Sequence, residues 1–159
     1  MIILTELIWD SLLNEFQWPR TRVERVAYID GVQCGDSQIA TTLTFPNAAM
    51  QPAYFTVSAA AMSEAGKHFR RFGMERLIQA HTHPGPLVEH SPFDDENAYS
   101  QLDGSVSIVI PNHARHRPDL TDCGIHIREP EGWRLLCAKE IERYIRLIPG
   151  CLDFRRFGA

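Results

Sequence analysis

The sequence predicts a mixed α/β fold in which helices pack on a central β-sheet. Patterns typical of strands and of helices alternate along the chain, and no repeat or low-complexity linker divides it. The chain has 159 residues and 44% of them are hydrophobic, which is enough to bury one core. We therefore expect a single domain over residues 1–159.

The first part of the chain predicts one helix followed by a pair of strands. The expected ranges are 5–17 for the helix and 23–33 and 39–45 for the strands. Ile8, Leu12 and Phe16 recur at helical spacing, and Trp18-Pro19 would end that helix. A Gly-Asp-Ser segment between the two strands predicts a hairpin turn.

A second helix is expected from Ser58, its N-cap, to Gly73, its stop signal. Four apolar residues share one face of it: Met62, Ala65, Phe69 and Phe72. We expect this stripe to lie in the core.

The rest of the chain continues the alternation of strands and helices. Strands are expected at 76–83, 105–110, 124–128 and 133–136, and helices at 92–102 and 138–148. In the last helix, Ile141, Ile145 and Ile148 share one face before Pro149-Gly150 ends it.

Composition limits the classes of partner and the cellular location. A net charge of −4 argues against a general nucleic-acid or anionic-membrane surface. The four cysteines have no CxxC spacing and are expected to be reduced thiols. The N-terminus turns acidic at Glu6, too early for a signal peptide, and no apolar run approaches the roughly 20 residues that span a bilayer. We expect a cytoplasmic protein.

The segment from His81 to Asp94 has the residue types of a catalytic zinc site. If His81 and His83 lie on one strand, their side chains project from the same face about 6 to 7 Å apart. Asp94 would add an oxygen, and three protein ligands leave the fourth position open for water. The alternative is a surface histidine pair, with Ser91 as an ordinary N-cap and Asp94 as a helix-start residue.

Two other classes of hydrolase with a His-x-His pair do not fit. A binuclear site would need Asp two places after His83, where this chain has Gly85. Amidohydrolase barrels need roughly 250 residues and carry the pair on their first strand.

The pattern His81-x-His83-Pro, then Ser91 and Asp94, resembles the JAMM (JAB or MPN-plus) zinc metalloproteases. The segment Glu24-Arg-Val-Ala-Tyr-Ile-Asp-Gly resembles the first core strand of that family. The chain departs from the family at Ala27 and at Gln79-Ala80, where glycine, or glycine and an aromatic residue, is common.

This resemblance implies a JAB/MPN-like, cytidine-deaminase-like fold with one zinc ion per chain. His81, His83 and Asp94 would bind the zinc, Glu24 would be the general base, and Ser91 would donate a hydrogen bond to the tetrahedral intermediate. Glu64 and Glu75 also precede the histidines, and the sequence alone does not choose between the three glutamates.

The resemblance also implies a substrate, namely a ubiquitin-like protein whose C-terminal tail is cut from a conjugate or a precursor. A compact prokaryotic conjugation system, with a role against phage in some cases, is the implied context. Two alternatives remain open: a peptidase that processes a sulfur-carrier protein, and a non-catalytic MPN-type scaffold.

Other histidines need a separate interpretation. His90 adjoins Ser91 and could line the cleft, whereas His68 and His126 are expected to be ordinary surface or hydrogen-bonded side chains. Residues 112–117 are polar and basic, and we expect a solvated loop there that could contact an acidic substrate surface.

Overall fold

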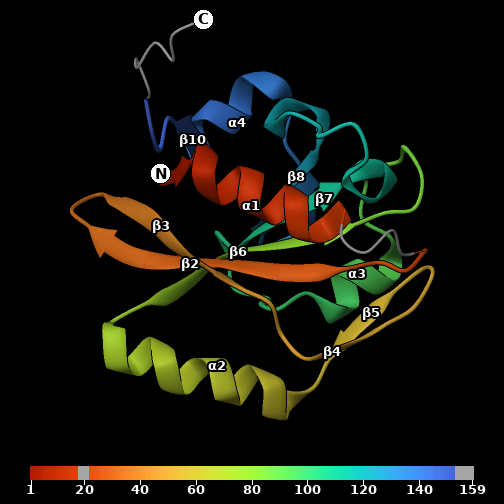
Figure 1. Ribbon diagram of the computed structural model, residues 1–159, viewed down its shortest axis with the longest axis horizontal. Coiled ribbons are helices and arrows are strands. Elements are labelled where there is room, and N and C mark those ends of the chain that lie inside the picture. The colour runs from red at the N-terminus through yellow and green to blue at the C-terminus, as the bar shows by residue number, and fades with distance from the viewer. Residues whose placement is uncertain (18–21, 153–159) are drawn as a thin grey trace, which may run out of the picture.

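The strands form one large mixed sheet and one small antiparallel sheet (Figure 1). This computed structural model describes residues 1–17 and 22–152. The large sheet has the order β10-β1-β3-β2-β6-β7-β8-β9, and it contains both parallel and antiparallel neighbours. Its strands are β1 (Ile2–Thr5), β2 (Val26–Cys34), β3 (Ser37–Thr44), β6 (Glu75–Thr82), β7 (Val106–Ile110), β8 (Gly124–Glu129), β9 (Gly132–Leu135) and β10 (Ile145–Ile148). The small sheet pairs β4 (Ala48–Met50) with β5 (Phe55–Val57).

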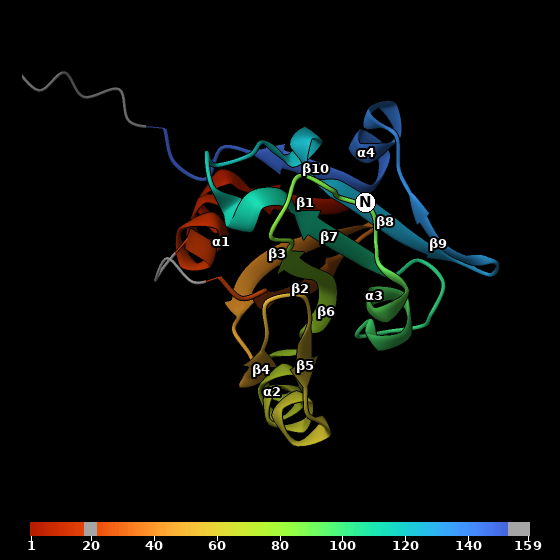
Figure 2. The same ribbon diagram turned by 90° about the vertical axis from the view of Figure 1, so that its right-hand side faces the viewer.

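Helices pack on the large sheet, as the sequence predicts, and the structure places them on both of its faces. The four α-helices are α1 (Glu6–Gln17), α2 (Ala59–Phe72), α3 (Pro92–Asn97) and α4 (Ala138–Tyr144). Helix α1 covers one face of β2 and β3, and α2 lies on the other side of these strands (Figures 1 and 2). Residues of α1 and of the central strands share one buried cluster, which includes Trp9, Leu12, Leu13, Phe16, Ile29, Ile78, Ile108 and Ile125. The mixed α/β class is confirmed.

Strand β6 occupies the middle of this sheet and carries the first candidate ligand. His81 pairs with Val26 of antiparallel β2 on one side and with Val109 of parallel β7 on the other. The end of β6 is therefore held on both edges, and the His81 side chain is 0% exposed.

The prediction that the apolar stripe of α2 lies in the core is wrong. No residue of α2 is buried, and Phe72 is 59% exposed. A hollow of about 550 Å³ separates Ala65, Phe69 and Phe72 from the short threonine side chains of β3. An amphipathic pattern shows which side of a helix turns toward the sheet, but not how closely the two pack.

The predicted last helix is too long. Helix α4 ends at Tyr144, and the next four residues form β10, which pairs in parallel with β1 from Ile2↔Ile145 to Thr5↔Ile148. Ile145, Arg146 and Leu147 also alternate between apolar and polar, which is the period of a strand. Pairing with β1, a strand that the sequence analysis missed, decides between the two periods.

Two other helix ends differ from expectation or lie outside the described part. Helix α3 ends at Asn97 instead of 102, and the Tyr99 amide donates to the Gln79 side chain on β6 at 2.9 Å. This bond to the sheet replaces the backbone bonds that a longer helix would form. Trp18-Pro19, expected to end α1, is outside the described residues.

The remaining expectations concern the oxidation state of the cysteines and membrane-spanning segments. Cys34, Cys123, Cys137 and Cys151 are all free. Within residues 1–17 and 22–152, no helix combines the length and the apolar character that crossing a membrane requires.

Candidate metal centre

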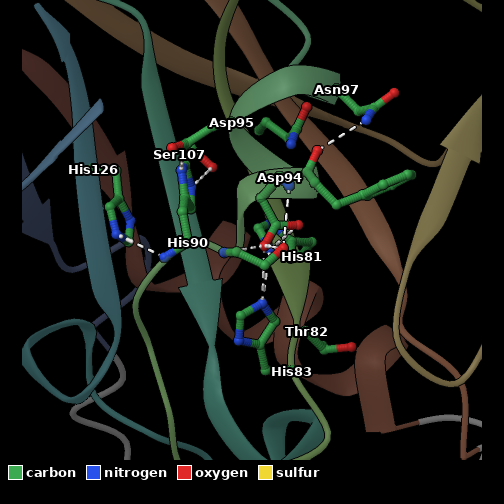
Figure 3. Close-up of polar contacts among 12 residues, drawn as sticks. His81, Thr82, His83, His90, Asp94, Asp95, Asn97, Ser107 and His126 are labelled. Carbon is green, nitrogen blue, oxygen red and sulfur yellow. Dashed lines mark hydrogen bonds and ion pairs between the residues drawn. The ribbon is translucent and has the colours of Figure 1, made fainter. Parts of the chain in front are cut away.

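Three predicted ligands meet at the end of β6. His81 is the second-last residue of this strand, His83 follows it directly, and Asp94 lies in the first turn of α3. The two Nε2 atoms are 3.3 Å apart, and Asp94 places Oδ1 3.3 Å from His81 Nε2 and Oδ2 3.4 Å from His83 Nε2. Figure 3 shows the three side chains pointing toward one another. We call these three residues the metal cluster, because their spacing allows them to hold one ion.

The contacts within the metal cluster are compatible with one ion. Zinc bonds of about 2.0–2.1 Å to nitrogen or oxygen place neighbouring ligand atoms of a tetrahedron about 3.3–3.4 Å apart. The two Nε2 atoms are 3.3 Å apart, and Asp94 approaches each of them with a different oxygen, Oδ1 at 3.3 Å and Oδ2 at 3.4 Å. One ligand atom from each of the three residues lies within 4.8 Å of the other two. Two imidazoles and one carboxylate also form a donor set that zinc prefers, and one tetrahedral position remains for water.

The surroundings of His83 direct its Nε2 lone pair into the metal cluster. Its Nδ1 lies 3.1 Å from the carbonyl oxygen of Leu87 and donates to it. With the proton on Nδ1, Nε2 is free to bind a cation, which is how outer hydrogen bonds fix the tautomer of a ligand histidine. His81 differs, because its buried Nδ1 has no hydrogen-bond partner among the described residues.

Burial and mutual attraction shift the pKa values of the three ligands in different directions. Desolvation lowers the pKa of His81. Burial also opposes the charge of His83, but Asp94 and Glu24 raise its pKa above the ordinary value. The Asp94 carboxyl loses solvation as well, yet hydrogen bonds from the histidines and Ser91 bring its pKa well below its usual range. Asp94 is therefore a permanent anion in the centre of the site.

Strand register brings Glu24 to the same site. Val26 pairs with His81 on antiparallel strands. Continuing this register by two residues places Glu24 opposite His83. Glu24 is buried, 3% exposed, with Oε2 unpaired in the described part of the chain. Desolvation raises its pKa to about 7, against the attraction of His83 and together with the repulsion of Asp94. Glu64 and Glu75 are exposed on α2 and at the far end of β6.

Ser91 has a double contact with Asp94. Its hydroxyl oxygen accepts from the Asp94 amide at 3.2 Å as the N-cap of α3, and the same hydroxyl donates to Asp94 Oδ2 at 2.6 Å. The Asp94 carboxylate accepts in turn from the Ser91 amide at 2.7 Å. The same hydrogen bonds therefore cap α3 and orient the Asp94 carboxylate. Ser91 can be an ordinary N-cap while Asp94 is a metal ligand.

The solvated loop predicted at residues 112–117 is only partly correct, because residues 115–117 are exposed but residues 111–114 form a largely buried turn next to His83. Asn112, His113 and Ala114 have φ of 54°, 51° and 57°, a conformation that costs about 1–2 kcal/mol per residue other than glycine. The His113 amide donates to the His83 carbonyl at 2.9 Å, so this turn supports the segment that follows β6. Backbone strain of this kind is common beside functional sites.

A second group of polar side chains lies next to the metal cluster, and the sequence analysis did not assemble it. We call it the His90 cluster, and its members are His90, Asp95, Ser107 and His126 (Figure 3). The rings of His81 and His90 have centroids 5.9 Å apart. Ser107 and His126 alternate with apolar residues on buried strands, a signal for which side they face but not for their partner.

Comparison with known proteins gives a fold relative but no family. No protein-family model and no curated protein sequence matches the chain. Among solved structures, protein DSY2949 from Desulfitobacterium hafniense is similar at a TM-score of 0.71 and 20% identity, over 94% of each chain. AF2198, a JAB1/MPN domain protein from Archaeoglobus fulgidus, superposes at a TM-score of 0.48 and 18% identity, over 86% of this chain and 98% of that one. The similarity to DSY2949 is one of fold alone.

Proposed function

We propose that this protein is a zinc-dependent hydrolase of the JAMM type that cleaves an amide bond. The observation that carries the proposal is the metal cluster itself, in which one ligand atom from each of the three residues lies close enough to the others to hold one ion. The nearby Glu24, with a pKa raised to about 7, supplies the group that such a hydrolase needs in addition to its metal.

In the proposed reaction, Glu24 transfers the proton of a water that the metal ion would activate. His81, His83 and Asp94 would hold the zinc ion, which would supply a bound water with a pKa of about 7 and a Lewis acid for the carbonyl oxygen. Glu24 accepts a proton from the attacking water and delivers it to the departing amine nitrogen as the C–N bond breaks. A carboxyl with a pKa near the working pH suits both transfers, which typically contribute roughly 100- to 10,000-fold.

Ser91 has a defined role in the resting structure and a proposed one in the reaction. Its hydroxyl proton points to Asp94 Oδ2, so it orients a ligand. Donation to the oxyanion of the tetrahedral intermediate, the role implied by the resemblance, requires the hydroxyl to turn away from Asp94. Loss of such a donor typically costs about 3 to 4 kcal/mol of barrier.

As substrate we propose a ubiquitin-like protein with an extended C-terminal tail, cut from a conjugate or a precursor. The proposal follows the resemblance of the His81–Asp94 segment. The small sheet has only β4 and β5, so both are edge strands within the described residues, and the Glu24 amide joins this sheet to the site through the Gln51 carbonyl at 2.8 Å. Backbone pairing beside such a sheet suits an extended peptide, and glycines at its end allow a close approach to a metal. Four free thiols favour a reducing compartment, so we place the reaction in the cytoplasm.

Zinc content and cleavage together test the proposal. We would compare wild type, Glu24→Gln and His83→Ala for zinc per chain and for cleavage of fusions to ubiquitin-like proteins. Glu24→Gln should retain zinc and lose roughly 100- to 10,000-fold in turnover, because it keeps the ligands but not the base. His83→Ala should lose zinc and activity, while His68→Ala on exposed α2 should match wild type.

The outcomes also separate the alternatives. A wild-type chain that takes up no zinc would favour the scaffold. Preference for a tail-extended sulfur carrier over a lysine-linked conjugate would favour the processing peptidase. A Glu24→Gln variant as active as wild type would remove Glu24 as the base and leave the metal site standing.

A further inference from the structure

His90 uses both ring nitrogens to connect α3 with the sheet. Its Nδ1 lies 2.8 Å from Asp95 Oδ1, and its Nε2 lies 3.0 Å from Ser107 Oγ. Asp95 is on α3 and follows Asp94 directly, and Ser107 is on β7. Because a carboxylate only accepts, Nδ1 donates to Asp95, and the neutral ring accepts from the Ser107 hydroxyl at Nε2.

This chain of contacts has the order of a serine hydrolase triad but cannot act as one. A serine nucleophile must reach its substrate, and Ser107 is 0% exposed in the middle of β7. Its hydroxyl therefore has a structural role, because it gives a buried strand a polar side chain that holds the ring of His90.

Three further contacts hold His90, two through its ring and one through its backbone amide. The rings of His90 and His126 stack with centroids 3.8 Å apart and an interplanar angle of 15°. The His90 amide donates to His126 Nε2 at 3.3 Å, and the ring of Trp133 meets His90 edge-on at 5.3 Å. Strands β7, β8 and β9 thus all contact one residue, which is four positions before Asp94.

Helix α3 depends on such contacts. It has six residues, and an isolated helix shorter than about 12–15 residues is only marginally stable in water. Its C-terminal side is attached to β6 where the Tyr99 amide donates to Gln79. Besides the contact of Asp94 with His81, the pair of His90 and Asp95 gives α3 a second side-chain connection to the large sheet.

We propose that His90 is a positioning residue: through Asp95, Ser107 and His126 it holds α3 so that the Asp94 carboxylate is already oriented toward the two histidine ligands before an ion binds. This inference rests on the proposed function, because it presumes that the metal cluster binds zinc. Outer residues that orient ligands typically contribute 10- to 100-fold to metal affinity.

A set of variants separates hydrogen bonding from packing. His90→Phe keeps a flat ring for the stack but loses both side-chain hydrogen bonds. His90→Asn places an amide nitrogen near the position of Nδ1 and can still donate to Asp95. Asp95→Ala removes the partner on α3, and Glu96→Ala removes the same charge from a neighbouring exposed position on that helix.

The measurement is the zinc dissociation constant by competition with a chromophoric chelator, beside thermal unfolding of the metal-free variants. We expect His90→Phe to weaken zinc binding about 10- to 100-fold, and Asp95→Ala about three- to tenfold. His90→Asn should recover most of the affinity, and Glu96→Ala should stay within about twofold of wild type. The visible spectrum of the cobalt-substituted protein should change in His90→Phe and return toward wild type in His90→Asn.

Each result has a defined meaning. Equal zinc affinity in wild type, His90→Phe and Asp95→Ala overturns the inference and leaves the proposed function intact. No zinc binding by the wild type overturns both. If His90→Phe does not fold, Asp95→Ala still decides, because the Asp95 side chain is 47% exposed and its loss spares the core.

Discussion

The metal cluster and the His90 cluster each contain two histidines and an aspartate, and the His90 cluster adds Ser107, yet their nitrogen atoms have different partners. In the metal cluster, the Nε2 atoms of His81 and His83 face each other across 3.3 Å. In the His90 cluster, the nitrogens of His90 have Asp95 and Ser107 as partners, and His126 Nε2 accepts a backbone amide. When both imidazoles of the metal cluster carry their proton on Nδ1, the two Nε2 lone pairs converge and favour a cation, whereas both side-chain nitrogens of His90 already have hydrogen-bond partners.

The two aspartates show the same difference within one dipeptide. Asp94 is buried, with its pKa lowered chiefly by the hydrogen bonds of His81, His83 and Ser91 against the effect of burial. The Asp95 side chain is 47% exposed and contacts one histidine. Since successive residues of a helix point in different directions, one short helix can serve both clusters with neighbouring residues.

The largest expected effect on zinc affinity is that of Asp94→Asn, and Asp95→Asn is its matched comparison. Asp94→Asn removes the negative charge between two imidazoles and should weaken zinc binding by about 100-fold or more. Asp95→Asn keeps an oxygen that can accept from His90, so its zinc affinity should stay within about threefold of wild type. Competition with a chelator measures the zinc affinity of both variants. Equal losses of affinity would contradict the different roles assigned to the two clusters.

The metal cluster was predictable from sequence because its geometry is local. Residues two apart on a strand share a face, and the Ser91 cap places Asp94 in a first helical turn. The structure brings Glu24 to the cluster through the pairing of Val26 with His81, which a sequence does not display. The choice among three glutamates therefore needed either the family resemblance or the fold.

The features that escaped prediction all depend on partners far along the chain. Residues 145–148 satisfy a helical and a strand period, and β1, at the opposite end of the sequence, decides between them. The stripes of α1 and α2 both have helical spacing, but α1 buries four residues and α2 none. His90 and Ser107 lie 17 residues apart, and nothing in either segment shows that they meet.

A smaller effect concerns the stability of the metal-free protein and arises from Glu24. Its pKa is raised from 4.5 to about 7 in the folded state, mainly by burial, so the folded protein binds a proton there more tightly than the unfolded chain. Its contribution to stability is present below pH 4.5 and falls as pH rises to about 7. Glu24→Gln cannot ionise and should be more stable than wild type by roughly 1–3 kcal/mol at pH 8.

Urea unfolding of chelator-treated protein at pH 4.5 and pH 8 measures this difference. The two proteins should converge at the lower pH, and Glu64→Gln, at an exposed position of α2, should match wild type at both. A stabilisation that is the same at both pH values would show that the effect does not come from ionisation of Glu24.

The smallest effect is expected at His126, the member of the His90 cluster that lies outermost from the metal cluster. Burial lowers its pKa to about 3, so the ring is neutral at pH 7 and its Nε2 accepts from the His90 amide. His126→Phe keeps the stack but leaves that buried amide without an acceptor, which should cost about 1–2 kcal/mol of unfolding free energy. Since the side chain of His90 retains Asp95 and Ser107, zinc affinity should fall less than in His90→Phe. A His126→Phe protein with a zinc affinity as weak as that of His90→Phe would mean that the stack, and not the hydrogen bonds of His90, orients α3.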